Sequence, residues 1–148
     1  MTAARDELRE HIRDEPPPGG DVVVIRGGPD SVGKLQTHAR RTRRAWNLDG
    51  QPIWGISVFC ALDDLGSASF DGLLAGRLGT YRRIHHCRVA DLLGLGYTLL
   101  PTFGRPHYTL VLPSDEDAEL TRLLACLGPP RDNPKHPPNT VSGRRPRP

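Results

Sequence analysis

The sequence predicts a single α+β domain over about residues 21–128, with a mixed sheet of about five strands and three to four helices. Residues 21–26 and 53–60 are short apolar runs of the length and β-branched content typical of buried strands. Residues 30–46 and 114–127 repeat apolar side chains at helical spacing. A chain of 148 residues also has the length of one domain.

Both ends of the chain are predicted to lie outside that domain, at residues 1–20 and 129–148. The first fourteen residues carry charge on every face, with Leu8 and Ile12 as an apolar pair one helical turn apart, which predicts a short exposed helix that docks weakly. Residues 16–20 are proline and glycine and form a flexible linker. The C-terminal tail is basic, rich in proline and without apolar periodicity, so we expect it to be disordered.

The first half of the domain is predicted as strand, helix and central strand. Gly27-Gly28-Pro29 turns the chain after the strand at 21–26, and Asp30 can cap the helix that follows. The run 53–60 is apolar on both faces apart from Ser57, which predicts a central strand covered on both sides. The expected buried face of the helix is made by Val32, Leu35, Ala39, Thr42 and Trp46.

The second half is predicted as shorter elements that end in a longer helix. Helical turns are expected at residues 70–78 and 89–93, and further strands at 80–86, 97–100 and 107–112. The last two strands are separated by a proline- and glycine-containing loop and should form a hairpin. Ser114 and Asp117 have the spacing of a capping box, which predicts where the final helix begins.

The composition excludes several classes of protein. The three cysteines form no C-x-x-C pair, which argues against a disulfide scaffold and a zinc site, and we expect no metal. The charged N-terminal segment does not resemble a signal peptide, and no apolar run reaches the roughly 18 residues of a membrane span, so we expect a cytoplasmic protein without membrane contact. Motifs of P-loop, Rossmann and α/β-hydrolase proteins are absent from the sequence.

The basic charge has two interpretations. The formal net charge is +3, and of the 20 basic residues only Lys34 and Lys135 are lysine. A basic surface suits phosphate, nucleic acid or an acidic partner. The arginine skew equally suits a GC-rich genome, and both interpretations stay open at this point.

Two segments carry a resemblance to a known family. Val24-Ile25-Arg26-Gly27-Gly28 ends the first strand, and Trp54-Gly55-Ile56-Ser57-Val58-Phe59 forms the central strand. Together they resemble the first two signature regions of the ADP-ribosyltransferase fold. The resemblance implies that Arg26 and Ser57 are the catalytic pair, and that NAD is held by Arg26, Gly27, Gly28, Ser57 and Phe59.

The sequence departs from this family at its third element. The family places a glutamate on a later strand, where it stabilises the positively charged ribose as nicotinamide leaves. No glutamate occurs from residue 22 to residue 113, so a carboxylate within the core must be an aspartate. From the resemblance we expect a small bacterial ADP-ribosyltransferase-like protein, which the missing glutamate leaves either active or catalytically degenerate. We expect it to act as the toxin of a two-gene module with a cognate antitoxin.

Two alternatives come from other classes of protein. One is an RNA-binding protein or a metal-independent endoribonuclease toxin, in which basic groups hold the phosphates and histidine moves protons. The other is a non-catalytic module that binds a protein partner. His107 and Thr109 also form a His-x-Thr segment similar to half of the signature of two-histidine phosphoesterases. The residues expected to contact RNA are His38, Arg40, Arg41, Arg44, Arg83 and His107.

Overall fold

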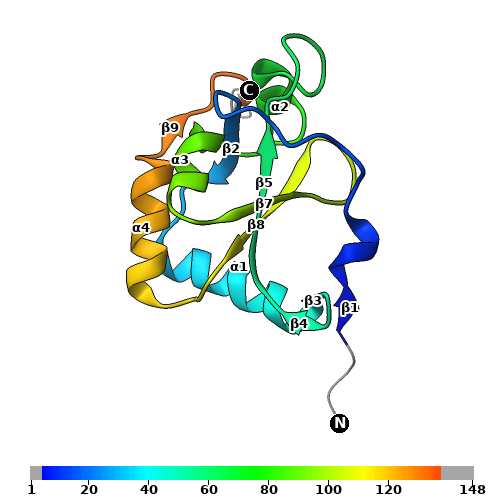
Figure 1. Ribbon diagram of the computed structural model, residues 1–148. Helices are drawn as coiled ribbons and strands as arrows, with labels where there is room; N and C mark the ends of the chain where they lie inside the picture. The colour runs from blue at the N-terminus through cyan, green and yellow to red at the C-terminus, as the bar shows by residue number, and fades with distance from the viewer. Residues whose placement is uncertain (1–4, 138–148) are drawn as a thin grey trace, which may run out of the picture.

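The computed structural model describes residues 5–137, and its strands form two sheets (Figure 1). The larger sheet has the strand order β7-β8-β5-β2-β6-β9, and all its neighbouring pairs are antiparallel. Its strands are β2 (Val23–Gly28), β5 (Trp54–Cys60), β6 (Arg83–Arg88), β7 (Thr98–Pro101), β8 (His107–Leu112) and β9 (Arg131–Asp132). The α+β class of a single small domain is thereby confirmed.

The smaller sheet has the mixed pairing that we expected of the main one. Its strands are β1 (Asp6–Glu7), β3 (Trp46–Leu48) and β4 (Gln51–Pro52). The pairing of β1 with β3 is parallel, whereas that of β3 with β4 is antiparallel. Asp49 and Gly50 turn between β3 and β4 with φ angles of 51° and 84°.

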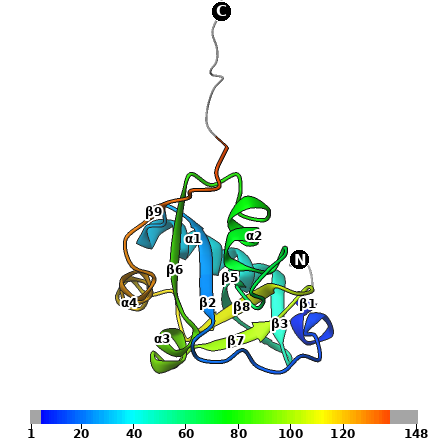
Figure 2. The same ribbon diagram turned by 90° about the horizontal axis from the view of Figure 1, so that it is seen from above.

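The large sheet separates two apolar cores, because alternate residues of a strand point to opposite faces. One core packs helices α1 (Val32–Ala45), α3 (Val89–Gly94) and α4 (Asp117–Leu127) against the sheet. The other, smaller core packs α2 (Phe70–Ala75) against Ile25 and Ile84. Figure 2 shows α3 and α4 on one side of β2 and β6 and α2 on the other.

Two predicted helix caps differ from the structure. Ser31, rather than Asp30, caps α1, because its Oγ accepts a hydrogen bond from the Lys34 amide while the Asp30 carboxylate pairs with an arginine. The predicted capping box of α4 does not form. The Ser114 Oγ accepts from the Glu116 amide instead, and Glu116 holds the N-cap position without a side-chain bond.

The N-terminal segment packs differently from the expected exposed helix. Residues 6–11 form β1 and the short 3-10 helix η1 (Leu8–His11), and Leu8 is fully buried. Glu7 accepts hydrogen bonds from the Asp49 and Gly50 amides, so this segment is tied to the β3–β4 turn. A short helical turn therefore forms, but the prediction that it is exposed and docks weakly was wrong, because the burial of Leu8 depends on contacts far along the chain.

The domain also extends past its expected end at residue 128. β9 pairs with β6, and the side chain of Asn133 is buried against the end of α2 and the segment that follows it. The prediction of a disordered tail from residue 129 was therefore wrong for residues 131–137, while residues 138–148 lie outside the described part of the chain. Among the described residues, none of the helices has the length and apolar character needed to span a bilayer.

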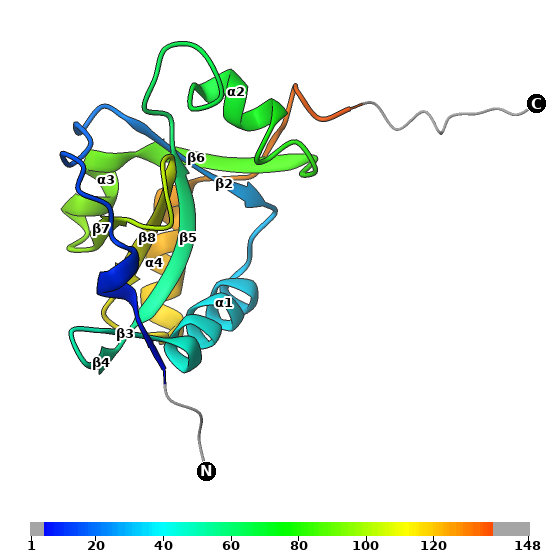
Figure 3. The ribbon, with the colours of Figure 1, turned by 90° about the vertical axis from the view of Figure 1, so that its right-hand side faces the viewer.

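The sheet splits between β2 and β5. These strands pair only at Val24–Cys60 and Ile25–Phe59, whereas β2 stays paired with β6 as far as Gly28. β5 meanwhile pairs with β8 from Trp54 to Phe59. The two central strands therefore separate beyond Ile25, as Figure 3 shows, and the N-terminal end of α1 lies near the opening.

Candidate active site

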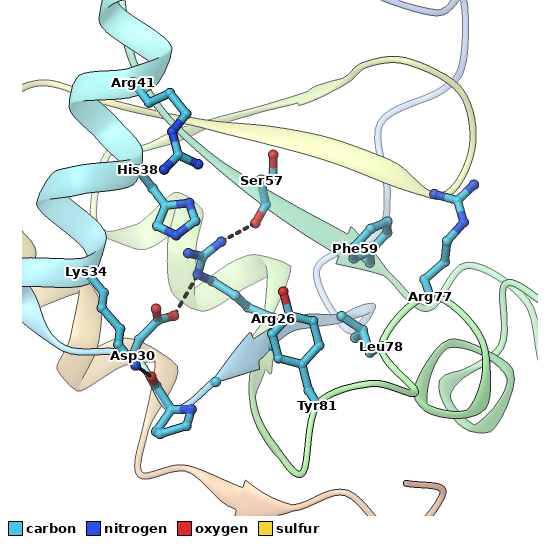
Figure 4. Close-up of a pocket in the computed structure, with 13 residues that line it drawn as sticks. Arg26, Asp30, Lys34, His38, Arg41, Ser57, Phe59, Arg77, Leu78 and Tyr81 are labelled. Carbon is cyan, nitrogen blue, oxygen red and sulfur yellow. Dashed lines mark hydrogen bonds and ion pairs between the residues drawn. The ribbon is translucent and has the colours of Figure 1, made fainter. Parts of the chain in front are cut away.

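A cavity of about 570 Å³ occupies the split between β2 and β5. We call it the split cavity. All five residues expected to bind NAD line it, namely Arg26, Gly27, Gly28, Ser57 and Phe59. Its remaining walls come from the turn before α1, from the face of that helix between Lys34 and Arg41, and from residues 77–81, as Figure 4 shows.

Arg26 lies at the base of the split cavity with its guanidinium already bonded. Its Nε donates to Asp30 Oδ2 at 2.6 Å, and its Nη1 donates to the carbonyl oxygen of Ser57 at 2.7 Å. The side chains of Arg26 and Asp30 are 8% and 4% exposed, respectively. Arg26 therefore joins the end of β2, the start of α1 and the middle of β5, and it forms the floor of the cavity.

Ser57 presents its carbonyl and its hydroxyl in different directions. Extending the β2–β5 register would place Arg26 opposite Val58, so Arg26 and Ser57 project from opposite faces of the sheet. In the split, the arginine reaches the Ser57 carbonyl, and the Ser57 side chain points away from it (Figure 4). Ser57 is exposed, so the prediction that the central strand is covered on both sides was wrong at this residue.

Gly27 and Gly28 are glycines because aromatic rings lie against them. A Cβ on Gly27 would lie 2.6 Å from ring carbons of Tyr81, and one on Gly28 would lie 2.7 Å from the ring of His85. Tyr81 is 44% exposed, whereas His85 is fully buried. The turn therefore admits no larger side chain at Gly28 unless a buried ring moves.

His85 fixes the turn that leads into α1. Its Nε2 accepts from the Asp30 amide at 3.0 Å, so its Nδ1 carries the proton and donates to the Gly128 carbonyl at 2.8 Å. His86 lies on the opposite face against Phe70, as the strand alternation predicts. The contact of His85 with Asp30 had no signal in the sequence, because 55 residues separate them.

The split cavity is strongly basic. Lys34, Arg41 and Arg77 line it, and within residues 5–137 none of the three forms an ion pair. The Lys34 ammonium donates to the Pro29 carbonyl, and the Arg77 guanidinium lies 5.6 Å from the Phe59 ring. The only carboxylate in its described lining is Asp30, which is paired with Arg26, so the cavity suits an anionic ligand.

His38 lies between these cations. Burial lowers its pKa from the usual value of 6.5, and the charges of Arg26 and Arg41 lower the pKa further. Its imidazole is therefore mainly neutral at pH 7 and can accept a proton.

The residues expected to contact RNA do not form one site. His38 and Arg41 line the split cavity, while Arg40 pairs with Asp115 and Arg83 pairs with Asp132. Arg44 is exposed on α1 and outside the described cavity lining. His107 Nδ1 lies 3.1 Å from both the carbonyl and the Oγ1 of Thr102.

A smaller cavity of about 250 Å³ adjoins the split cavity along α1 and β5. We call it the side cavity. It shares His38, Arg41 and Ser57 with the split cavity, and Trp46 lines its far end. The two cavities thus form one groove, along which the Ser57 side chain is exposed.

Sequence reasoning missed several residues of this groove. Lys34 could have been predicted from the sequence, because Lys34, His38 and Arg41 are spaced to share one face of a helix. No sequence pattern predicts Arg77 and Tyr81, since they follow α2 and reach the cavity only through the tertiary fold.

Comparison of the chain with protein-family models, with curated proteins and with solved structures finds no match.

Proposed function

We propose that the split cavity binds NAD and that the protein is ADP-ribosyltransferase-like. The observation that carries the proposal is that Arg26, Gly27, Gly28, Ser57 and Phe59 all line one basic cavity, although the side chains of Arg26 and Ser57 point away from each other. These residues come from two strands that the family resemblance had already singled out. Their convergence is a tertiary property that the sequence motifs alone do not guarantee.

The walls of the split cavity fit a dinucleotide in size and chemistry. A volume of about 570 Å³ lies within the range of roughly 300–1,000 Å³ typical of small-molecule sites. Lys34 and Arg41 would hold the pyrophosphate, because neither is engaged by a carboxylate among the described residues. Tyr81 and Phe59 provide aromatic surface for a base or for the nicotinamide ring.

The proposed roles of Arg26 and Ser57 are narrower than the resemblance implies. Arg26 would shape the cavity floor and hold the Ser57 carbonyl, while the exposed Ser57 hydroxyl would meet the ligand. NAD, when bound, supplies an activated glycosidic bond to nicotinamide. Neutral His38 would take the proton from an attacking acceptor, with its own Nδ1 or Nε2 as the base.

The missing glutamate leads to a specific expectation. No free carboxylate lines the described part of the split cavity, so nothing there replaces the charge stabilisation that the family's glutamate provides. We therefore expect NAD to bind and to be hydrolysed slowly in the absence of an acceptor.

Calorimetric titration of NAD tests this proposal. We expect saturable binding to the wild type, and a loss of about tenfold or more in affinity for Lys34→Ala and Arg41→Ala, because each removes a charge-assisted contact. Arg44→Ala is the matched control, since this exposed arginine lies on the same helix and outside the described cavity lining. Absence of binding, or an equal loss in the control, would contradict the proposal.

A further inference from the structure

An aromatic cluster lies at the far end of the groove from the split cavity. His11, Trp46 and Phe103 form it, with ring centroids between 5.0 and 5.2 Å apart. The cluster continues toward the split cavity through His107, whose ring lies 5.5 Å from both Phe103 and Phe59. Five rings from separate segments of the chain thus form a continuous row.

Phe103 is held at the surface in an unusual conformation. Its φ angle is 61°, a value that bulky residues rarely adopt, and the residue is 43% exposed. The Phe103 amide donates to the His11 carbonyl at 3.0 Å, which fixes this backbone geometry. An exposed aromatic ring kept in a strained backbone conformation is typical of a ligand-contacting position.

The cluster and the basic groove meet at Trp46. This residue packs against Phe103 and also lines the side cavity, together with His38, Arg41 and Ser57. The described lining of the side cavity contains no carboxylate. Stacking surface therefore adjoins a strip of positive charge.

We infer that this groove binds a single-stranded nucleic acid. Single strands are bound by aromatic rings on which bases stack, set beside cations that contact the phosphates. Phe103 and Trp46 provide the stacking surface and Arg41 the cation. This surface keeps His38 and Arg41 from the set of basic residues that the sequence suggested for RNA and adds the rings of Phe103 and Trp46. The inference does not depend on NAD binding.

The test is fluorescence anisotropy with labelled 12-nucleotide oligo(rU) and oligo(dT), and with a DNA duplex of the same length. We expect both single strands, or one of them, to bind more tightly than the duplex, with an affinity that falls as salt rises. A preference for oligo(rU) would identify RNA as the ligand through its 2′-hydroxyl groups. Equal binding of the duplex, or no binding, would overturn the inference.

Two variants link the binding to the groove. Phe103→Gly suits the positive φ and should keep the fold, yet we expect it to weaken binding about fivefold or more, and Phe103→Tyr to retain it. Arg41→Gln should reduce the slope of log affinity against log salt by about 1. Leu93→Ala and Arg88→Gln are the controls, because both side chains are exposed and lie outside the groove.

The two proposals can fail separately. Phe103 lies outside the described lining of the split cavity, so Phe103→Gly should leave the NAD titration unchanged. Unchanged nucleic-acid affinity in both Phe103→Gly and Arg41→Gln would overturn the inference, whatever the result with NAD.

Discussion

The guanidinium of Arg26 donates from Nε to the carboxylate of Asp30 at 2.6 Å, and both side chains are almost completely buried. The same guanidinium donates from Nη1 to the Ser57 carbonyl. One ion pair thus holds β2 and α1 beside β5 at the point where the sheet splits. The shape of the split cavity depends on this pair, whichever ligand the cavity takes.

Breaking the pair from one side should strongly destabilise the protein. Arg26→Met leaves a buried carboxylate without a partner and Asp30→Leu leaves a buried guanidinium, so we expect each to lower the free energy of unfolding by about 3–5 kcal/mol. The double variant should lose much less than the sum of the two. Denaturation by guanidinium chloride of the wild type, the two single variants and the double variant measures this coupling. Additive losses would contradict the structural role of the pair.

Alanine should be tolerated differently at the two adjacent glycines. At Gly27 the new Cβ meets Tyr81, an exposed ring that can swing aside, so we expect little loss of stability. At Gly28 it meets His85, which is buried and bonded at both nitrogens, so we expect a loss of about 1–3 kcal/mol. Urea denaturation compares them, and equal losses would show that the two rings are equally free to move.

The pKa of His38 should lie below the usual 6.5, because of burial and the charges of Arg26 and Arg41. Arg41→Gln removes one of these charges and should raise the pKa toward 6.5, while Arg44→Gln should leave it unchanged. NMR titration of the imidazole signals measures both. A His38 pKa above 6.5 in the wild type would contradict the arrangement of charges described above.

The same shift sets the direction of the pH dependence of stability. Unfolded His38 binds a proton with a pKa near 6.5, more tightly than the folded protein does, so the unfolded state takes up more protons between the two pKa values. The contribution of His38 to stability is present above pH 6.5 and is lost as the pH falls through the folded-state pKa. Denaturation midpoints measured from pH 7.5 down to pH 5 should fall less in His38→Gln than in the wild type.

Asn133 should stabilise residues 77–81, which form one wall of the split cavity. Its Nδ2 donates to the carbonyls of Leu74, Leu78 and Tyr81 at 3.0 to 3.1 Å. Asn133→Ala leaves these acceptors without their donor, and we expect a loss of about 1–3 kcal/mol. Asn133→Asp should lose more, because it places an acceptor against three acceptors.

Denaturation and hydrogen exchange check the role of Asn133. Amide exchange over residues 74–82 should accelerate in both variants, since the Tyr81 carbonyl loses its partner. Lys135→Ala is the control, because the exposed Lys135 side chain makes no hydrogen bond in the described structure. Unchanged exchange in Asn133→Ala would show that the turn is held by other contacts.

The sequence by itself determined the α+β class and the order of most elements along the chain. Apolar runs and helical spacing are local properties, so the strands around Val24 and Ile56 and the helix around Leu35 could be found without tertiary information. It also pointed to Arg26 and Ser57, because a charged strand end and a polar residue in an apolar strand stand out in the chain.

Only the tertiary structure decided what those residues contact. Arg26 and Ser57 are 31 positions apart, and Asn133 lies 59 positions from Leu74, so no local pattern records either contact. The burial of Leu8 and the row of rings from Phe59 to Phe103 depend on distant segments in the same way. Side-chain periodicity shows which face of an element is apolar, but it does not show which strands pair. The split between β2 and β5, and therefore the cavity, follows from β2 staying paired with β6 and β5 with β8.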